Sequence, residues 1–380
     1  LSRHGLVSGG NESYLSLLRR IKMGLFFKKR KVKPIFVGSY GNDLTRGIYV
    51  FHIDIDNGEI LKKKFYKSLA NPIAISKRER FIYVCYKNNT GRPTDGGLWQ
   101  YASMDLQFGL AGKSTDHGKT YVDSYVNEDR TCAYAVDYYN SEVVVIPILK
   151  QKIVKVVQTI KHQGSSVDEK RQNEAHPCFI DATPDQKWIV VCDLGTDEIV
   201  LYDIGEKGRL QRNDELTFKV KPGSGPKKII FSPDGQFAYV LSELTSEIHV
   251  YRYEDGVFTF VQTVKTYPTD EYIGQNTAGD ILINEKGDYL FVSNCGHDSV
   301  TTFEVDLATG MLTAVDNTDT DEKPVSMILV IDKYIVVASQ KGGSIESFEV
   351  RRGESKGVLF ETHFSYMVSE PVCLIEGRGI

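Results

Sequence analysis

The sequence lacks long apolar runs, abundant cysteine and an excess of positive charge. No stretch approaches the ~20 apolar residues that a membrane-spanning helix needs. Six cysteines in 380 residues are too few for a disulfide-stabilised scaffold, and several stand in apolar stretches as buried thiols do. Because 46 Lys and Arg face 50 Asp and Glu, the chain is not a generally basic nucleic-acid binder. We therefore expect a reduced, cytoplasmic protein with no membrane span and no nucleic-acid partner.

Motifs that bind cofactors or metals are also missing. The sequence contains no G-x-S-x-G elbow, no H-E-x-x-H zinc motif, no C-x-x-C pair and no dinucleotide glycine fingerprint. A metal site formed by Asp280, His176 and Glu243 is not excluded, but the spacing of these residues matches no metal-binding motif. We therefore expect no cofactor and assign no metal ligand.

The rest of the composition, with 41% hydrophobic and 25% charged residues, is that of an ordinary globular protein. Residues 1–33 differ because they are rich in Lys and Arg, above all in the stretch 28–33. We interpret 1–33 as a basic tail, solvated or appended, with contact to an anionic membrane surface or nucleic acid as the alternative. Residues 34–376 then form a single domain, and 377–380 a C-terminal tail.

One pattern recurs along the domain. A short strand leads through a polar turn to a strongly apolar strand, which another turn connects to an alternating strand. The apolar strands are expected at 81–86, 132–137, 188–193, 237–242, 289–293 and 334–339, and their starts are 45 to 56 residues apart. This spacing is close to the ~40–50-residue period of four-stranded propeller blades. No long helical periodicity follows residue 33, so the pattern predicts an all-β fold.

Six complete units are visible, and a seventh is divided between the two ends of the domain. Strands expected at 34–40 and 46–53 lack the first strand of the pattern, and 370–375 has the character of the missing one. A ring closed by both termini leaves no exposed sheet edge. The sequence thus predicts a seven-bladed β-propeller closed by N- and C-terminal strands in one blade, with a pair of β-sandwiches as the competing architecture.

The propeller architecture predicts where a functional site would lie. The innermost strand of a blade runs down the channel, the second returns and the third descends again. The start of the innermost strand and the turn between the second and third strands therefore share one face of the ring. Residues expected at this mouth are, at strand starts, His176, Lys227, Lys228 and Asp280, and, in the turns, Tyr139, Asp193, Glu243, Asn294, Cys295 and His297. Such a mixture of groups suits a small polar or anionic ligand.

These residues also have structural interpretations. His176 and His297 are equally well explained as hydrogen-bonded turn residues, and Glu243 as an ion-pair partner of Lys227. In a regular strand Lys227 and Lys228 point to opposite faces, so only one of them needs to enter the channel. A nucleophilic role for Cys178 or Cys295 beside a histidine is a further alternative.

A set of motifs resembles the lactonase family of seven-bladed propellers, which includes bacterial 6-phosphogluconolactonases and fungal carboxy-cis,cis-muconate cyclase. The resemblance runs from about Pro34 to Leu374 and is specific only when the motifs are taken together. The motifs are His176-Pro with Thr183-Pro-Asp, Asp193-Leu-Gly-Thr-Asp197, Gly223-Ser-Gly-Pro226 with Phe231-Ser-Pro-Asp-Gly235, Ser242-Glu-Leu-Thr-Ser246, Ser293-Asn with Gly296-His-Asp-Ser299, and Pro371-Val-Cys.

The resemblance also implies a site, from which this chain departs. The family site uses a His at the start of an innermost strand, an Arg after Gly-Pro, a Glu in an Asn-Glu-Leu turn and an Arg in a Ser-Asn-Arg-Gly turn. Glu243 matches, and His176 fits the first His of the family's His-Pro-His segment. Cys178 stands at the second His, Lys227 replaces the first Arg and Cys295 the second. Lysine keeps the charge but loses the bidentate fork of arginine.

The resemblance implies hydrolysis of a sugar-acid lactone of the 6-phosphogluconolactone type, with a small anionic substrate as the partner. Glu243 or His176 is expected as the general base, and Lys227 as a stabiliser of the developing oxyanion. Lys228 or His297 is expected to hold a phosphate or carboxylate, and Asp280 is a further substrate-binding candidate. The alternatives are a non-catalytic propeller that binds a small anion or a protein, and a cyclase- or isomerase-like enzyme.

Overall fold

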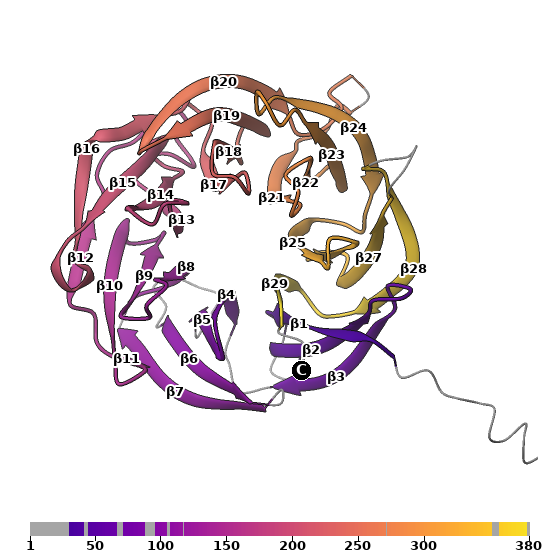
Figure 1. Cartoon of the computed structure of the whole chain (residues 1–380), viewed down its shortest axis with the longest axis horizontal. Helices are drawn as coiled ribbons and strands as arrows, with labels where there is room; N and C mark the ends of the chain where they lie inside the picture. The colour runs from indigo at the N-terminus through magenta and orange to yellow at the C-terminus, as the bar shows by residue number, and fades with distance from the viewer. Residues whose placement is uncertain are drawn as a thin grey trace, which may run out of the picture. The chain divides into compact units, whose positions relative to one another are not determined.

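The computed structural model describes residues 30–41, 45–66, 71–87, 96–104, 107–116, 118–270, 272–351 and 357–377 (Figure 1). The chain divides into two units, 1–31 and 32–380. The expected basic tail lies outside the described residues up to position 29, and so do residues 378–380. The account below concerns residues 32–377. In the described part of the chain, no helix has the length and apolarity that a membrane crossing requires.

The described residues form β-strands and one short 3-10 helix, η1 (Glu206–Gly208), which confirms the all-β prediction. The strands make seven sheets, numbered here as blades in order round the ring. Blade 1 consists of β29 (Pro371–Glu376), β1 (Val32–Ser39), β2 (Gly47–Asp54) and β3 (Ile60–Tyr66). Blade 2 consists of β4 (Pro72–Arg78), β5 (Phe81–Lys87), β6 (Gly96–Met104) and β7 (Gln107–Asp116). Blade 3 consists of β8 (Tyr121–Val126), β9 (Cys132–Asp137) and β10 (Glu142–Leu149), with β11 (Lys152–Ile153) and β12 (Gln158–Lys161) both paired to β10.

The other four blades follow the same order from the inside outward. Blade 4 consists of β13 (Pro177–Ala182), β14 (Trp188–Asp193), β15 (Glu198–Ile204) and β16 (Leu210–Lys219). Blade 5 consists of β17 (Pro226–Phe231), β18 (Phe237–Ser242), β19 (Glu247–Glu254) and β20 (Val257–Lys265). Blade 6 consists of β21 (Thr277–Ile283), β22 (Tyr289–Cys295), β23 (Ser299–Val305) and β24 (Leu312–Asp319). Blade 7 consists of β25 (Pro324–Val330), β26 (Tyr334–Ser339), β27 (Ser344–Val350) and β28 (Leu359–Met367).

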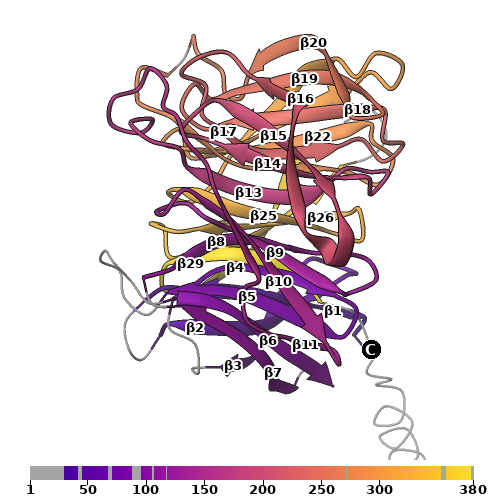
Figure 2. The same cartoon turned by 90° about the vertical axis from the view of Figure 1, so that its left-hand side faces the viewer.

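The ring closes through the two ends of the domain. β29, from the C-terminal end, is the innermost strand of blade 1 and pairs antiparallel with β1. The innermost strands contact one another in an unbroken cycle of β29, β4, β8, β13, β17, β21 and β25, and β25 again meets β29. Figures 1 and 2 show this arrangement from two directions. The seven-bladed prediction is confirmed in its closure, and a pair of sandwiches is excluded.

The core lies between adjacent blades, which explains why the second strand of each blade is apolar throughout. Seven hydrophobic clusters each join the faces of two neighbouring blades. In β14, Ile189 and Val191 pack toward blade 3, whereas Val190 and Cys192 pack toward blade 5. A strand buried on both faces needs apolar residues at every position rather than at alternate ones.

Glycines in several outer hairpins pack against the second strand of the preceding blade. Gly310, in the turn between β23 and β24, has a φ of +72°, and a Cβ there would lie 2.3 Å from Cδ1 of Phe237 at the start of β18. Gly357 takes the same place against Tyr289 of blade 6. At both positions a side chain would displace a core aromatic of the preceding blade, so glycine is required for packing as well as for the turn.

Candidate functional site

The turns between second and third strands meet at one end of the channel, called the mouth here. In every blade, a residue at the start of the innermost strand pairs with a residue near the end of the second strand, just before the register of the two strands shifts. Examples are Pro177 with Asp193 and Pro226 with Ser242. We call the residue that follows this partner the rim residue. In blade order, the rim residues are Tyr40, Lys87, Tyr138, Leu194, Glu243, Cys295 and Gln340.

A β-bulge at the start of the innermost strand adds a second set of residues at the mouth. The register shifts at this point in all seven blades, so one extra residue is inserted in each innermost strand. In blade order, the inserted positions hold Val372, Ile73, Val122, Cys178, Lys227, Gly279 and Val325. Bulges re-aim side chains and are frequent next to functional sites. Strict alternation therefore fails at Lys227 and Lys228, which explains how both reach inward.

The most strongly charged contact at the mouth surrounds Glu243. Its Oε1 accepts a hydrogen bond from Nη2 of Arg171 at 2.6 Å, and its Oε2 lies 3.0 Å from Nζ of Lys227. Lys227 also donates to the carbonyl oxygen of Ala278 at 3.3 Å. The side chain of Glu243 is 15% exposed and that of Arg171 is 41% exposed, so the pair opens to solvent on the arginine side. One carboxylate thus holds two cations from different parts of the ring.

The two cations set the protonation state of Glu243. Burial raises the pKa of the carboxyl, but the charges of Lys227 and Arg171 outweigh burial and bring this pKa down to about 2. Burial lowers the pKa of Lys227, but the neighbouring Glu243 carboxylate outweighs that effect and leaves the pKa above 10.5. The group therefore carries one negative and two positive charges at neutral pH, a net positive charge suited to an anionic ligand.

His176 lies beside this charged group through Tyr138. The imidazole and phenol rings stack at 4.2 Å with an interplanar angle of 7°. Burial raises the pKa of the Tyr138 phenol, and the nearby charge of Arg171 acts in the opposite direction. Nδ1 of His176 donates to the carbonyl oxygen of Tyr138 at 3.0 Å, since a carbonyl only accepts. Nε2 is then the ring nitrogen that carries the lone pair, and the described residues offer it no hydrogen bond.

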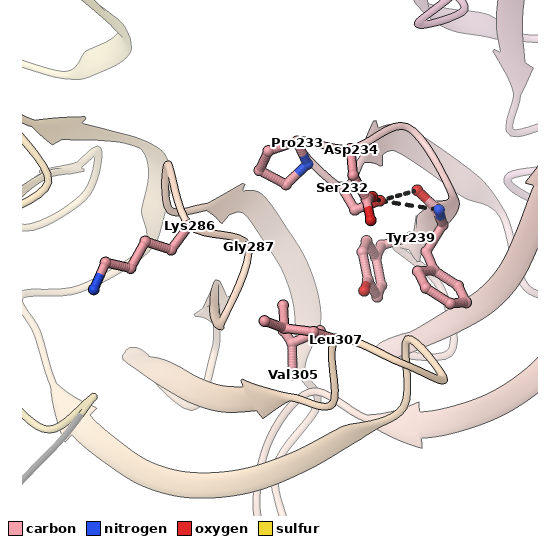
Figure 3. Close-up of a pocket in the computed structure, with 9 residues that line it drawn as sticks. Ser232, Pro233, Asp234, Tyr239, Lys286, Gly287, Val305 and Leu307 are labelled. Atoms are coloured by element: carbon pink, nitrogen blue, oxygen red, sulfur yellow. Dashed lines mark hydrogen bonds between the residues drawn. The ribbon is translucent and has the colours of Figure 1, made fainter.

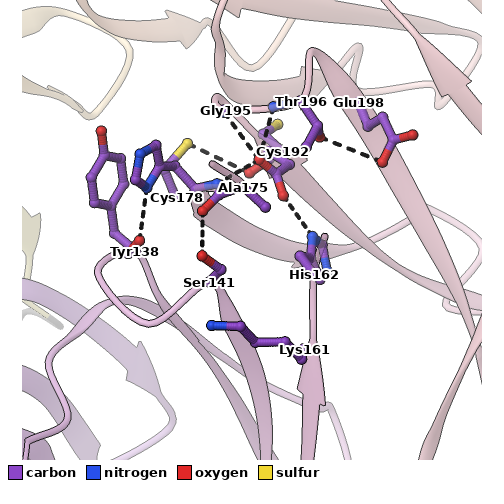
Figure 4. Close-up of polar contacts among 12 residues, drawn as sticks. Tyr138, Ser141, Lys161, His162, Ala175, Cys178, Cys192, Gly195, Thr196 and Glu198 are labelled. Atoms are coloured by element: carbon purple, nitrogen blue, oxygen red, sulfur yellow. Dashed lines mark hydrogen bonds and ion pairs between the residues drawn. The ribbon is translucent and has the colours of Figure 1, made fainter. Parts of the chain in front are cut away.

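Asp193 anchors the backbone of His176. Figure 4 shows the surrounding residues, among them Tyr138, His162 and Thr196. Its Oδ1 accepts from the backbone N–H groups of His176, Gly195 and Thr196 at 2.7, 3.0 and 3.2 Å. Its Oδ2 is 2.6 Å from Nδ1 of His162, a buried residue. Asp193 is therefore a structural anchor behind the mouth.

Asp197 links the chain segment that carries Arg171 to the segment that carries Lys227. Oδ1 accepts from Nε2 of Gln172 at 2.8 Å and from the backbone N–H of Gly225 at 2.7 Å. Oδ2 accepts from Oγ of Ser166 at 2.5 Å and from the N–H of Gly223 at 2.7 Å. Gln172 follows Arg171 in the chain, and Gly225 lies two residues before Lys227. This buried carboxylate thus fixes the segments leading to both cations.

The cysteines at the mouth are protonated thiols. The Cys178 thiol donates to the carbonyl oxygen of Pro226 at 3.4 Å, and burial raises its pKa well above the usual range. The Cys295 thiol donates to the carbonyl oxygen of Pro324 at 3.2 Å, and burial raises its pKa to about 11. Because the thiolate is the nucleophile, these environments disfavour covalent catalysis by either residue.

The other expected residues are not brought to Glu243. Lys228 forms an ion pair of 2.6 Å with Oδ1 of Asp280, and Oδ2 of Asp280 accepts from the N–H of Met327 at 2.9 Å. These bonds link blades 5, 6 and 7 deeper in the channel. His297 is paired with Ser299 at 2.9 Å, and its contacts within the described residues do not include the group around Glu243. We leave Lys228, Asp280 and His297 out of the site considered below.

Arg171 is the member of the site that sequence reasoning missed. It lies in the connection between β12 and β13, outside every repeated strand and turn, and no motif used for the resemblance includes it. Its place five residues before His176 was the only available signal. In the structure the Arg171 guanidinium contacts Glu243, although the two arginine positions of the family site hold Lys227 and Cys295 in this chain.

Two further observations restrict where the chemistry can lie. Within the described ranges, no three His, Cys, Asp or Glu side chains gather as metal ligands. A pocket of about 310 Å³ lies at the opposite end of the strands, between blades 5 and 6 (Figure 3). Phe237, Tyr239, Val305 and Leu307 make it largely apolar, and the Lys286 side chain extends away from Tyr239 in Figure 3. The convergent charged groups are therefore those at the mouth.

Comparison with known proteins places the chain in a family. The family model described as lactonase, 7-bladed beta-propeller, matches residues 34–376. An uncharacterized protein of Lactococcus lactis subsp. lactis (strain IL1403) is 31% identical over 352 residues, which cover 90% of this chain and 99% of the relative. The 6-phosphogluconolactonase of Bacillus subtilis (strain 168) is 27% identical over 350 residues, covering 89% and 97%.

Solved structures agree with this placement. The periplasmic gluconolactonase of Pseudomonas aeruginosa is 26% identical with a TM-score of 0.84, and the match covers 91% of this chain and 99% of that one. A putative 6-phosphogluconolactonase of Bacteroides fragilis NCTC 9343 is 28% identical with a TM-score of 0.83, covering 91% and 98%. The chain belongs to the lactonase family of seven-bladed β-propellers.

Proposed function

We propose that this protein hydrolyses the lactone of a sugar acid at the mouth, with 6-phosphogluconolactone as the first substrate to test. The observation that carries the proposal is the contact of Arg171 and Lys227 with Glu243, next to His176. Membership of the lactonase family and the likeness to a 6-phosphogluconolactonase support the same reaction class.

Of the two candidate bases, the electrostatics favour His176. A carboxylate whose pKa is about 2 has little tendency to take a proton from water near neutral pH. The imidazole of His176 is held in one orientation by its Nδ1–H bond to the Tyr138 carbonyl oxygen, which leaves the lone pair on Nε2. Imidazole accepts protons in the neutral pH range. We assign Glu243 the task of holding Arg171 and Lys227 in place.

The reaction then follows from the charges at the mouth. His176 Nε2 removes a proton from water while the water oxygen bonds to the lactone carbonyl carbon. The carbonyl oxygen becomes an oxyanion, which Arg171 or Lys227 stabilises. The carbon–oxygen bond of the ring breaks as the oxyanion collapses, and protonated His176 gives the proton to the departing ring oxygen. The product is the open hydroxy acid, and the imidazole returns to its neutral form.

The test is initial-rate hydrolysis of freshly generated 6-phosphogluconolactone with the spontaneous rate subtracted. We expect His176→Gln to lower kcat by about 100-fold or more, as loss of a general base does. The matched control is His363→Gln, because His363 lies on the outer strand β28 with its side chain 84% exposed. Equal rates for His176→Gln and the wild type would overturn the base assignment.

A wild-type rate equal to the spontaneous rate would overturn the proposed substrate. Binding of 6-phosphogluconate in that case would favour a propeller that holds a small anion without turning it over. The observation behind this second candidate is that Cys178 and Cys295 offer protonated thiols at two places where the family site has His and Arg. Calorimetry with 6-phosphogluconate therefore accompanies the rate measurement.

A further inference from the structure

Lys87 occupies the rim position of blade 2. It is the last residue of β5 and follows Tyr86, which pairs with Pro72 at the start of β4. Glu243 follows Ser242, which pairs with Pro226 in the same way in blade 5. The repeat therefore places Lys87 at the same level of the mouth as Glu243, with its backbone at the equivalent point of the blade.

Lys87 has no carboxylate counter-ion among the residues that the structure describes. Its Nζ lies 4.8 Å above the ring of Tyr40, and no carboxylate among the described residues lies within ion-pair distance of it. By contrast, Lys227 pairs with Glu243, Lys228 with Asp280 and Lys119 with Glu142. Burial lowers the pKa of Lys87, so the ammonium is partly desolvated. A half-buried cation without a counter-ion gains free energy when an anion binds.

The surroundings of Lys87 distinguish it from the site in blades 4 and 5. The inserted bulge residues of blades 1 to 3 are Val372, Ile73 and Val122, all apolar. The neighbouring rim residues are Tyr40 and Tyr138. Blade 2 is three blades from blade 5 in a ring of seven, so Lys87 and Glu243 lie on opposite sides of the mouth. Tyr138 and Arg171 lie along the shorter arc between them.

We propose that Lys87 binds the distal anionic group of the ligand, a phosphate monoester or a carboxylate, while the lactone end lies at Arg171 and His176. This inference rests on the proposed function, because it assigns the second end of the same ligand. The ammonium supplies the charge and the Tyr40 ring holds it from below. Lys87 thereby makes the site select sugar acids with a charged far end over neutral ones.

Isothermal titration calorimetry with unreactive open acids tests the inference independently of turnover. The probes are 6-phosphogluconate, glucarate and gluconate, which carry a terminal phosphate, a terminal carboxylate and a terminal hydroxyl. We expect the wild type to bind at least one of the two acids with a charged far end, 6-phosphogluconate or glucarate, about 10- to 100-fold more tightly than gluconate, as one charge-assisted contact provides. We expect Lys87→Gln to remove that preference and leave the affinity for gluconate unchanged.

Two variants serve as controls. Lys341→Gln removes a lysine from the equivalent turn of blade 7, where it pairs with Glu322 at 2.7 Å, and should leave all three affinities unchanged. Lys87→Arg keeps the charge and should retain most of the preference. An unchanged preference for the acids with a charged far end in Lys87→Gln, or no such preference in the wild type, would overturn the inference. If Lys87→Gln hydrolyses the lactone but binds 6-phosphogluconate and glucarate like the wild type, the proposed function stands and this inference falls.

Discussion

Replacement of Glu243 by Gln should destabilise the folded protein, because it removes the only carboxylate that contacts both Arg171 and Lys227 among the described residues. The pKa of Glu243 falls from its ordinary value of 4.5 to about 2 on folding. At about 1.4 kcal/mol for each pH unit, this difference corresponds to about 3 kcal/mol of free energy of unfolding. Because Arg171 is 41% exposed, solvent screening reduces the expected loss to about 2–3 kcal/mol.

The loss should depend on pH in a defined direction. Because the pKa of the folded state lies below that of the unfolded state, the stabilisation is fully present above pH 4.5 and disappears as pH falls toward 2. Less than half of the effect, about 1.5 kcal/mol at most, should remain at pH 3. Urea titrations of the wild type and Glu243→Gln at pH 7 and pH 3 measure both quantities.

Glu349→Gln is the matched control. Glu349 also lies between a lysine and an arginine, at 3.7 Å from Lys333 and 3.5 Å from Arg351, but it is 31% exposed on β27. Exposed pairs of this length contribute about 0–1 kcal/mol, so this variant should stay near the wild type at both pH values. The reasoning fails if Glu243→Gln is as stable as Glu349→Gln at pH 7, or if its deficit is the same at pH 3 as at pH 7.

Two further predictions concern packing and loop order. Gly310→Ala should lower the free energy of unfolding by about 2–4 kcal/mol, because the new Cβ meets the Phe237 ring at 2.3 Å. Gly118→Ala, at a φ of +74° with no atom of the described residues within 4 Å of the new Cβ, should cost only about 1 kcal/mol; equal thermal or urea midpoints for the two variants would contradict the packing argument. Asp197→Asn should speed amide hydrogen exchange in residues 163–175 and 221–226 while the strands of blades 1 and 7 stay protected. Unchanged exchange in those two segments would show that the carboxylate does not anchor them.

Strand positions and ring closure could be predicted from the sequence, because a strand that is buried on both faces is apolar at every position. Apolar runs such as 188–193 and 237–242 coincide with β14 and β18. The N-terminal strands lacked an innermost partner, and the segment at 370–375 supplied it as β29. These features depend only on the period of apolar residues and on the unfavourable exposure of an unpaired sheet edge.

It was harder to predict from the sequence which side chains point into the channel. Counting alternate residues along β17 sends Lys227 and Lys228 to opposite faces, because a bulge leaves no mark in residue type. The partners of Glu243 and Asp280 also depend on side-chain reach across blades, which periodicity does not encode. Arg171 stands in a connection that belongs to no repeat, and only the folded chain brings it to Glu243.

The bulge at the start of each innermost strand has a consequence for how such proteins diverge. The same bulge is present in blade 2, where the inserted residue is Ile73, and in blade 5, where the inserted residue is Lys227. The conformation therefore does not depend on the identity of the inserted side chain. Six of the seven inserted positions carry a side chain, and a substitution at one of them can change the chemistry of the opening. Gly279 in blade 6 is the exception, because a Cβ there would lie 2.4 Å from the Pro324 carbonyl oxygen. Selection can in this way move a charge from one blade to another and give related rings different ligands.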